Sequence, residues 1–176
     1  MSQLPKDNFD AIESHWIALA QAGDQAAFAH LFEQHHRRVY ALCLRLCQHP
    51  NCAEEATQEV FLRLWQKLDS YQGEANFSTW LHRLSVNHAI NFTRKGQWWR
   101  QRLNHDSSHE PSHNPIPQQG IDRLLPKLPV RRRQVFVLHA IEGYQHQEIG
   151  ELLGISSGAS KAHYHHARTQ LQEWLQ

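Results

Sequence analysis

The sequence predicts an all-α fold made of two small helical domains joined by a flexible linker. Apolar residues recur at three- and four-residue steps on both sides of a polar segment that contains Pro111, Pro115 and Pro117, and this spacing is typical of amphipathic helices. We find no comparable alternation of apolar and polar residues that would indicate β-strands. The length of 176 residues suits one or two domains.

Four helices are expected before the linker. The apolar stripes that predict the last three are Phe28, Leu31, Phe32, Val39, Leu42, Cys43 and Leu46; Val60, Phe61, Leu64, Trp65 and Leu68; and Phe77, Trp80, Leu81 and Leu84. Gly23 and Asp24 are expected to end the first helix, and Gly73 to mark the third break. Pro50 and Asn51, with Glu54 three residues later, indicate an N-cap with its capping box.

The segment 104–120 is predicted to be the linker. It is rich in Ser, His and Asn, and its prolines exclude a regular helix while its polar residues supply no core. The domain boundaries expected from this are 1–103 for the N-terminal domain, 104–120 for the linker and 121–176 for the C-terminal domain.

The C-terminal domain has the pattern of a helix-turn-helix. Pro129 can open a helix that ends at Gly143, and 146–153 supplies a second, shorter helix. Gly154, Ile155 and Ser156 form the expected tight turn, with Ser156 able to cap a third helix over 157–175. A helix, a short turn containing glycine and a second helix together define the motif.

The second helix of such a motif enters the major groove of DNA, so polar and basic side chains near its start are candidates for base and phosphate contacts. The candidates are Ser157, Ser160, Lys161, His163, Tyr164, His165 and Arg168, with Arg132 from the nearby basic run 131–133. Short helical hairpins with glycine turns are common in other proteins, and that alternative stays open on this pattern alone.

Charge, hydropathy and cysteine content limit the functional classes and the cellular compartments that suit this protein. The 18 basic and 17 acidic side chains leave a net charge of +1, so attraction to nucleic acid must come from local basic runs such as 94–102 and 123–133. No apolar run is long enough to span a membrane and no signal peptide is present, so we expect a cytoplasmic protein without membrane insertion. Three cysteines within ten residues suit reduced thiols.

Residues 128–168 read LPVRRRQVFVLHAIEGYQHQEIGELLGISSGASKAHYHHAR. This segment resembles region 4 of the sigma-70 family of RNA polymerase sigma factors, specifically of the two-domain extracytoplasmic-function (ECF) group. Residues 53–95, AEEATQEVFLRLWQKLDSYQGEANFSTWLHRLSVNHAINFTRK, resemble its region 2. The two matches occur in the expected order with a linker between them, and they identify the N-terminal helical bundle with region 2 and the helix-turn-helix with region 4.

The resemblance implies a sigma subunit without enzymatic activity that needs no cofactor or metal. Its implied partners are core RNA polymerase, through the beta-prime clamp helices and the beta flap, promoter DNA, and an anti-sigma factor. The polar face formed by Glu55, Gln58 and Glu59 is implied to bind the clamp helices, whereas a solvated acidic face is the alternative on charge alone. We assign Leu62, Trp65 and Leu68 on the same helix chiefly to packing.

The resemblance also places recognition and melting of the minus-ten element within residues 71–95. Extruding a base requires stacking surfaces and hydrogen-bond donors for the freed base. The implied set is Tyr71, Gly73, Asn76, Trp80, Asn87, Asn91, Arg94 and Lys95. Within this set, Asn87 is implied to contact the flipped base, and Arg94 and Lys95 are implied to hold backbone phosphates. For Trp80 two roles stay open, packing in the core and contact with the melted strand. Region 4 is implied to read the minus-thirty-five element.

His163 and His166 stand where the family usually has basic residues, so we expect phosphate contact there to strengthen as pH falls from about 8 to 6.

Two groups of residues have the side chains that bind metals, which is a further hypothesis. They are His105, His109 and His113, and Cys43, Cys47, His49 and Cys52. Pro111 would break the helix that could align the three histidines, and Cys43 and Cys47 lie on an apolar stripe, so both features argue against a metal site.

Two alternatives to a sigma subunit remain: a helix-turn-helix regulator that does not bind core polymerase in this way, and a metal- or thiol-responsive variant.

Overall fold

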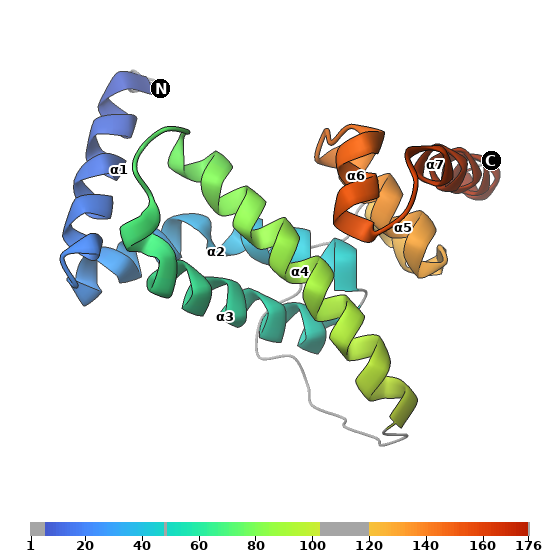
Figure 1. Ribbon diagram of the computed structural model, residues 1–176, viewed down its shortest axis with the longest axis horizontal. Coiled ribbons are helices and arrows are strands. Elements are labelled where there is room, and N and C mark those ends of the chain that lie inside the picture. The colour runs from blue at the N-terminus through green and yellow to red at the C-terminus, as the bar shows by residue number, and fades with distance from the viewer. Residues whose placement is uncertain (1–5, 48, 103–119, 176) are drawn as a thin grey trace.

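The computed structural model describes residues 6–47, 49–102 and 120–175, and the side chains of 12–47, 49–94 and 120–175. This part of the chain is helical and contains no β-strand. Figure 1 shows α1 to α4 together on the left and α5 to α7 on the right, with α4 reaching toward α6. The all-α fold with two groups of helices is confirmed.

The N-terminal group consists of α1 (Lys6–Gln21), α2 (Gln25–Cys47), α3 (Pro50–Lys67) and α4 (Phe77–Arg102), with a short 3-10 turn, η1 (Leu68–Ser70), after α3. Helix α2 lies at its centre and packs against α1, α3 and α4. The apolar stripes predicted from the sequence supply its core, in which Leu31, Leu46 and Leu64 are almost fully buried. Burying such a side chain contributes about 1.5–3 kcal/mol of stability.

Two helix starts in this group differ in how they are capped. Asp24 caps α2, because its Oδ1 accepts hydrogen bonds from the backbone N–H groups of Ala26 and Ala27 at 2.8 and 3.0 Å. The capping box expected at Pro50 and Asn51 is wrong. The N-cap of α3 is His49, which makes no side-chain cap hydrogen bond, and Pro50 occupies the first turn, where its missing N–H costs nothing.

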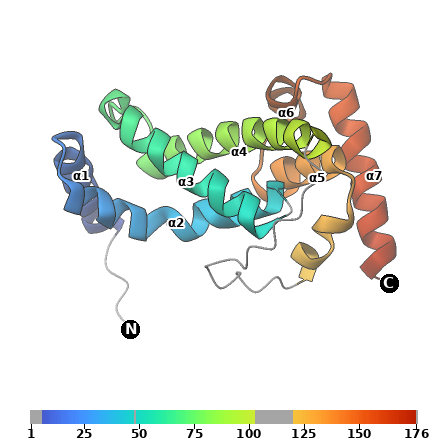
Figure 2. The same cartoon turned by 90° about the horizontal axis from the view of Figure 1, so that it is seen from below.

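The C-terminal group contains two 3-10 turns, η2 (Gly120–Arg123) and η3 (Leu125–Lys127), then α5 (Val130–Phe136), a π-helical segment η4 (Val137–Ile141), α6 (His146–Leu153) and α7 (Ser157–Leu175). Both α5 and α6 pack against α7. Figure 2 shows α7 along the outer side of this group, next to α5. The expected linker lies outside the described residues except for Gly120, which begins η2.

The turn between α6 and α7 has the geometry that its sequence predicts. Gly154 adopts a left-handed conformation with φ 67°, which glycine tolerates at no steric cost. Ser156 Oγ accepts a hydrogen bond from the N–H of Ala159 at 3.0 Å and so caps α7. Gly150 is required for another reason: a Cβ there would lie 2.7 Å from the carbonyl oxygen of Ile155. These positions confirm the helix-turn-helix.

Candidate nucleic-acid and partner-binding surfaces

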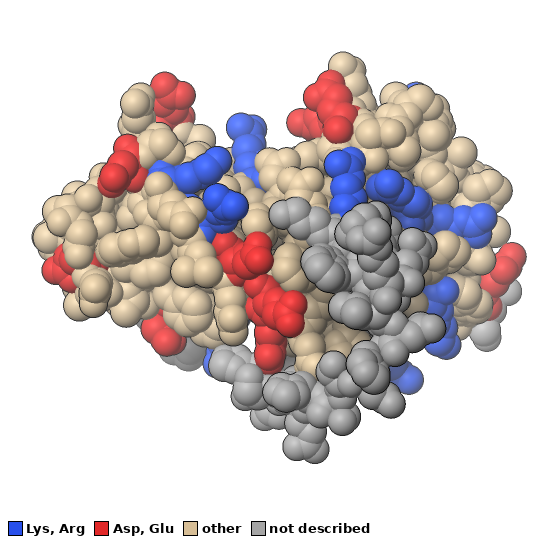
Figure 3. Space-filling view, turned by 60° about the horizontal axis from the view of Figure 1, so that its bottom comes forward, with Lys and Arg blue, Asp and Glu red and all other residues tan. Residues whose placement is uncertain are grey.

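One face of α3 combines acidic, amide and apolar side chains. Glu55, Gln58 and Glu59 are exposed as expected, and Glu59 Oε2 accepts a hydrogen bond from Nε2 of His88 on α4 at 2.8 Å. Figure 3 shows acidic side chains gathered in a band across the part of the view where α3 runs. The three residues predicted from the sequence therefore do share one solvent-facing surface.

The packing role assigned to Leu62 is wrong. Leu62 is 63% exposed and Trp65 is 40% exposed, whereas Leu68 is buried as expected. Trp65 still packs its ring edge-to-face against Phe28 at 4.8 Å between centroids. Because Leu62 follows Glu55 by seven residues, it extends the acidic stripe along the same helix face. We define this α3 surface as Glu55, Gln58, Glu59 and Leu62.

The loop before α4 is held in one shape by hydrogen bonds from its own residues and from α1. The Tyr71 hydroxyl donates to the carbonyl of Ala75 at 2.7 Å, and Gln21 Nε2 donates to the carbonyls of Leu68 and Tyr71 at 2.9 and 3.0 Å. Gly73 has φ 78°, which only glycine adopts readily. Residues 71–76 thus form a preorganised wall at the start of α4.

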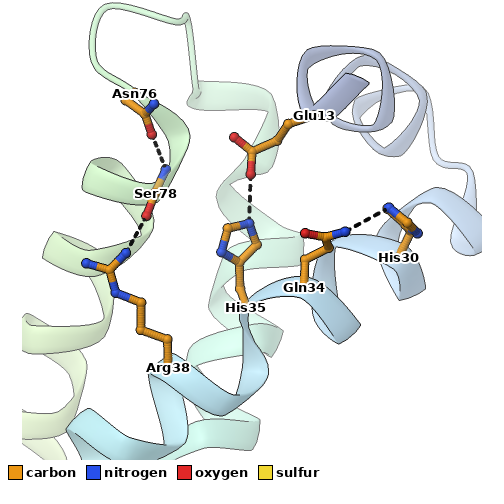
Figure 4. Close-up of polar contacts among 7 residues, drawn as sticks. All are labelled: Glu13, His30, Gln34, His35, Arg38, Asn76 and Ser78. Carbon is orange, nitrogen blue, oxygen red and sulfur yellow. Dashed lines mark hydrogen bonds and ion pairs between the residues drawn. The ribbon is translucent and has the colours of Figure 1, made fainter. Parts of the chain in front are cut away.

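Asn76 caps α4 and ties this loop to α2. Asn76 Oδ1 accepts a hydrogen bond from the N–H of Ser78 at 2.9 Å, an N-cap contact. The Ser78 hydroxyl accepts one from Arg38 Nη1 at 2.9 Å. Figure 4 shows this chain of contacts from α2 to the start of α4, beside the separate pair of His35 and Glu13. The amide oxygen of Asn76 is therefore already used inside the protein.

Three aromatic rings lie beside the loop. Phe77 is buried, and Tyr71 and Trp80 pack against it and against each other, with 5.3 Å between the centroids of Tyr71 and Trp80. Tyr71 and Trp80 are half-buried. Both functions weighed for Trp80 are compatible with this position, because one part of the ring packs on the core and the rest faces solvent.

Polar residues form a continuous stripe along α4. Asn87, Asn91 and Arg94 are exposed, and Arg83 extends the stripe by one turn toward the loop. Asn87 Nδ2 donates to the carbonyl of Arg83 at 2.9 Å. Arg83 is absent from the residues singled out in the sequence, although its position four residues before Asn87 places it on the same face. The side chain of Lys95 lies outside the described residues.

The α7 candidates divide between an exposed and an inward face. Lys161, His165 and Arg168 are exposed, and Ser157 at the start of the helix is half-buried. Their spacing of four, four and three residues places them on one side of α7. We define this α7 surface as Ser157, Lys161, His165 and Arg168, a set with the polar and basic character that base and phosphate contacts require.

The other α7 candidates face the rest of the domain. Ser160 is fully buried, and its hydroxyl forms a hydrogen bond of 2.9 Å with His146 Nδ1. Tyr164 packs against Phe136 and His139, with ring centroids 5.9 and 4.6 Å apart. The structure corrects the expectation for Ser160, because a buried hydroxyl that joins α6 to α7 is not presented to DNA.

The basic run on α5 contributes less exposed charge than its sequence indicates. Arg132 Nη1 donates to Gln170 Oε1 on α7 at 2.9 Å, and Arg133 is 2% exposed.

His163 on α7 is half-buried, and its pKa is lowered by burial and by the nearby charges of Arg132, Arg131 and His166. His163 is therefore neutral at pH 7, so the expected strengthening of phosphate contact at this residue requires a pH below its ordinary value of about 6.5.

A stability test follows from His146, whose ring stacks on His139 at 4.1 Å between centroids. Burial lowers the pKa of His146, as do His139 and Lys161. A folded-state pKa below the unfolded value gives stability that is present above the unfolded pKa and is lost as pH falls through it. We expect the urea midpoint to drop between pH 7.5 and 5.5, and His146→Gln to reduce that drop. An equal drop in both proteins would contradict this origin.

Cys43 and Cys47 are buried in the core near the end of α2, and Cys52 is half-buried at the start of α3. Burial raises the pKa of Cys43 to about 12, and the hydrogen bond with Cys52, together with burial, raises the pKa of Cys47. Within the described residues, no group of three or more His, Cys, Asp or Glu side chains is arranged to hold a metal ion. His105, His109 and His113 lie outside the described residues.

The fold and these surfaces define a two-domain helical protein with a helix-turn-helix in its second domain. Residues 31–100 match the family described as Sigma-70 region 2, and residues 118–171 match Sigma-70, region 4. The chain is 30% identical over 176 residues to the ECF RNA polymerase sigma factor SigW of Bacillus subtilis, covering 90% of this chain and 94% of SigW. The chain belongs to the ECF group of sigma-70 family sigma factors.

A second relative and two solved structures agree with this assignment. The chain is 34% identical over 166 residues to the ECF RNA polymerase sigma factor SigE of Mycolicibacterium smegmatis, covering 87% of this chain and 64% of the length of SigE. The structure of CnrH in complex with the cytosolic domain of CnrY matches at a TM-score of 0.53 and 24% identity, covering 91% of this chain and 94% of that one.

The sigma factor RpoE, solved in complex with the anti-sigma factor NepR from Bartonella quintana, matches at a TM-score of 0.57 and 22% identity, covering 84% of this chain and 96% of that one. At these identities the two structures establish the shared fold. The two family matches and the ECF relatives support sigma factor function over the helix-turn-helix regulator that the sequence left open.

Proposed function

We propose that this protein directs core RNA polymerase to promoters by reading the minus-ten element with α4 and its preceding loop and the minus-thirty-five element with α7. The observation that carries the proposal is the exposed α3 surface within the region 2 match. An acidic stripe that contains a 63% exposed leucine suits a partner interface better than a solvated face, because leucine gains from burial against a partner.

The domain boundaries proposed from the sequence are 1–103, 104–120 and 121–176. The described helices support them, because α4 ends at Arg102 and η2 begins at Gly120. Within the region 4 domain, Trp174 and Leu175 are exposed at the end of α7. We assign this apolar pair to the contact with the beta flap.

Each DNA-reading surface has a defined chemical role in this proposal. The stripe of Asn87 and Asn91 offers amide groups to an extruded base, and Arg83 and Arg94 meet backbone phosphates. Lys161 and Arg168 anchor α7 to the duplex, while Ser157 and His165 face base edges. The protein positions DNA and polymerase and makes or breaks no covalent bond itself.

The cellular setting follows from the same function. In the described part of the chain, no helix has the length and apolar character needed to cross a membrane. A factor that binds polymerase and promoter DNA works in the cytoplasm. An anti-sigma factor is the proposed regulator, since the structural relatives CnrH and RpoE were solved with CnrY and with the anti-sigma factor NepR.

The test is co-elution of the purified chain with bacterial core RNA polymerase on size exclusion. Changing Glu55, Gln58 and Glu59 together to Lys is expected to abolish co-elution, because the changes reverse the charge of the α3 surface without touching the buried face of the helix. A charge-matched control is Glu33, Glu151 and Gln172 to Lys, all exposed and away from α3. If the folded wild-type chain does not bind, or if the control loses binding equally, the proposal fails.

A further inference from the structure

One residue of the α3 surface is held in place by a residue of another helix. Glu59 Oε2 accepts a hydrogen bond from Nε2 of His88 on α4 at 2.8 Å, a short distance that is typical of hydrogen bonds to a charged group. Helices α3 and α4 pack against each other (Figure 1), and 29 positions separate the two residues in the sequence. In the part of the chain that the structure describes, Glu55 and Gln58 make no such contact with another helix.

The two side chains of this pair differ in how freely they can move. The His88 side chain is 17% exposed and the Glu59 side chain is 50% exposed, so packing restricts the imidazole much more than it restricts the carboxylate. An exposed glutamate samples several rotamers. The restricted imidazole therefore fixes the freer carboxylate, and not the reverse.

The hydrogen bond leaves the carboxylate able to bind a partner. A carboxylate is only an acceptor, so Nε2 of His88 carries the proton of this bond. An ionised carboxylate has about four acceptor positions on its two oxygens, and the bond to His88 is made by Oε2. A basic side chain of a partner protein can therefore bind Glu59 without displacing the imidazole.

His88 lies beside the α4 stripe without belonging to it. Asn87, the preceding residue, is exposed, and consecutive residues of a helix point about 100° apart. The ring of His88 is turned toward α3, where it meets Glu59. A substitution at His88 therefore changes the α3 surface and leaves the amide groups of α4 in place.

We propose that His88 is a positioning residue for polymerase binding, which holds the carboxylate of Glu59 in the orientation that a basic side chain of core RNA polymerase binds. This inference rests on the proposed function, because the orientation of Glu59 matters only if the α3 surface binds polymerase. A carboxylate that is already ordered in the free protein loses less conformational entropy on association. A pair this exposed adds little to the free energy of folding, so its effect is expected in binding.

The experiment measures the dissociation constant of the full-length chain for immobilised core RNA polymerase by surface plasmon resonance. His88→Leu removes the donor and keeps an apolar side chain against α3. We expect it to weaken binding by about two- to tenfold, the effect of leaving one flexible side chain to be ordered on association. Unchanged binding would overturn the proposal. Tighter binding would also overturn it, because the imidazole would then shield the charge of Glu59.

His88→Gln tests whether the hydrogen bond or the packing of the ring is responsible. Glutamine offers an amide N–H donor at a similar reach, so its dissociation constant should stay within about twofold of the wild-type value. A loss as large as that of His88→Leu would assign the effect to ring packing and contradict the positioning role.

A double-mutant cycle with Glu59→Ala identifies the residue through which His88 acts. If His88 acts through Glu59, adding His88→Leu to Glu59→Ala should change the dissociation constant by less than about twofold. Losses that multiply independently would mean that His88 affects polymerase binding by another route, which the proposal does not allow.

Two controls separate positioning from folding and from promoter reading. His30→Leu removes another half-buried imidazole of the same domain, one that contacts Trp16 on α1 with 4.5 Å between ring centroids, and it should bind polymerase like the wild type. Helical circular dichroism should be the same for all variants. At saturating polymerase, His88→Leu should open a promoter as well as the wild type does, and a loss there would show that His88 supports α4 itself.

Failure of this proposal can be distinguished from failure of the proposed function. A wild-type chain that binds core polymerase, together with a His88→Leu variant that binds equally well, rejects the positioning role and leaves the proposed function standing. A folded wild-type chain that does not bind core polymerase rejects both.

Discussion

Replacing both Asn87 and Asn91 by alanine is expected to leave core polymerase binding unchanged and to reduce promoter opening by about 10- to 100-fold. A polar contact to a base is worth about 1–3 kcal/mol, and flipping the base itself costs a few kcal/mol, so losing the amides on α4 raises the free energy of the open complex. Both side chains are exposed, so their truncation has little effect on the free energy of unfolding.

The measurement is permanganate reactivity of unpaired thymines on a promoter mapped with the wild-type holoenzyme. Gln172→Ala serves as the control, because Gln172 is an exposed amide near the end of α7, outside the α4 stripe. Permanganate reactivity that is equal for the double variant and the wild type would mean that the α4 stripe does not hold the melted strand.

Replacing both Lys161 and Arg168 by alanine is expected to weaken holoenzyme binding to double-stranded promoter DNA and to lower its salt dependence. Each lost phosphate contact reduces the slope of log K against log salt by about 0.9, so the double variant should lose about 2 from that slope. The two residues lie seven positions apart on the exposed side of α7, which lets both reach one duplex.

The matched control is Arg123→Ala with Lys127→Ala, which removes the same charge from exposed positions of the same domain before α5. That pair should leave the slope close to its wild-type value. If both double variants lowered the slope equally, the effect would come from the net charge of the domain and not from the α7 surface.

Local features of the fold were predictable from the sequence because they depend on residues close together in the chain. Helical periodicity places most of α2, α3 and α4, and Gly154 with Ser156 defines the turn before α7. The placement of Asn87 and Asn91 on one exposed face follows from their spacing alone. Their contact with a flipped base remains a prediction.

Contacts between distant residues were not predictable in this way. Arg45 and Asp122 are 77 positions apart, and Arg133 and Leu46 are 87 apart. The run 131–133 has the composition of a phosphate-binding patch, and only the packing of α5 on α2 shows that Arg133 is buried. Ser160 differs from its exposed neighbours because His146, fourteen residues earlier, forms a hydrogen bond with its hydroxyl.

Leu62 shows in a different way why the helical spacing of apolar residues does not by itself predict which of them are buried. Its spacing from Trp65 and Leu68 matches an apolar helix stripe, yet α3 packs on its neighbours through Val60, Phe61 and Leu64, which leaves Leu62 in solvent. An apolar residue at helical spacing marks a buried face only when a partner covers it. For Leu62 the proposed cover is core polymerase.

Transcription in a reconstituted system is the sharpest test of promoter selection by this protein. Core RNA polymerase, which initiates poorly by itself, is incubated with fragmented genomic DNA from the source organism, with and without the purified chain, and the 5′ ends of the transcripts are mapped. We expect discrete start sites that require the chain and share sequence elements near minus ten and minus thirty-five. Start sites that are the same with and without a folded, polymerase-bound chain would contradict that expectation.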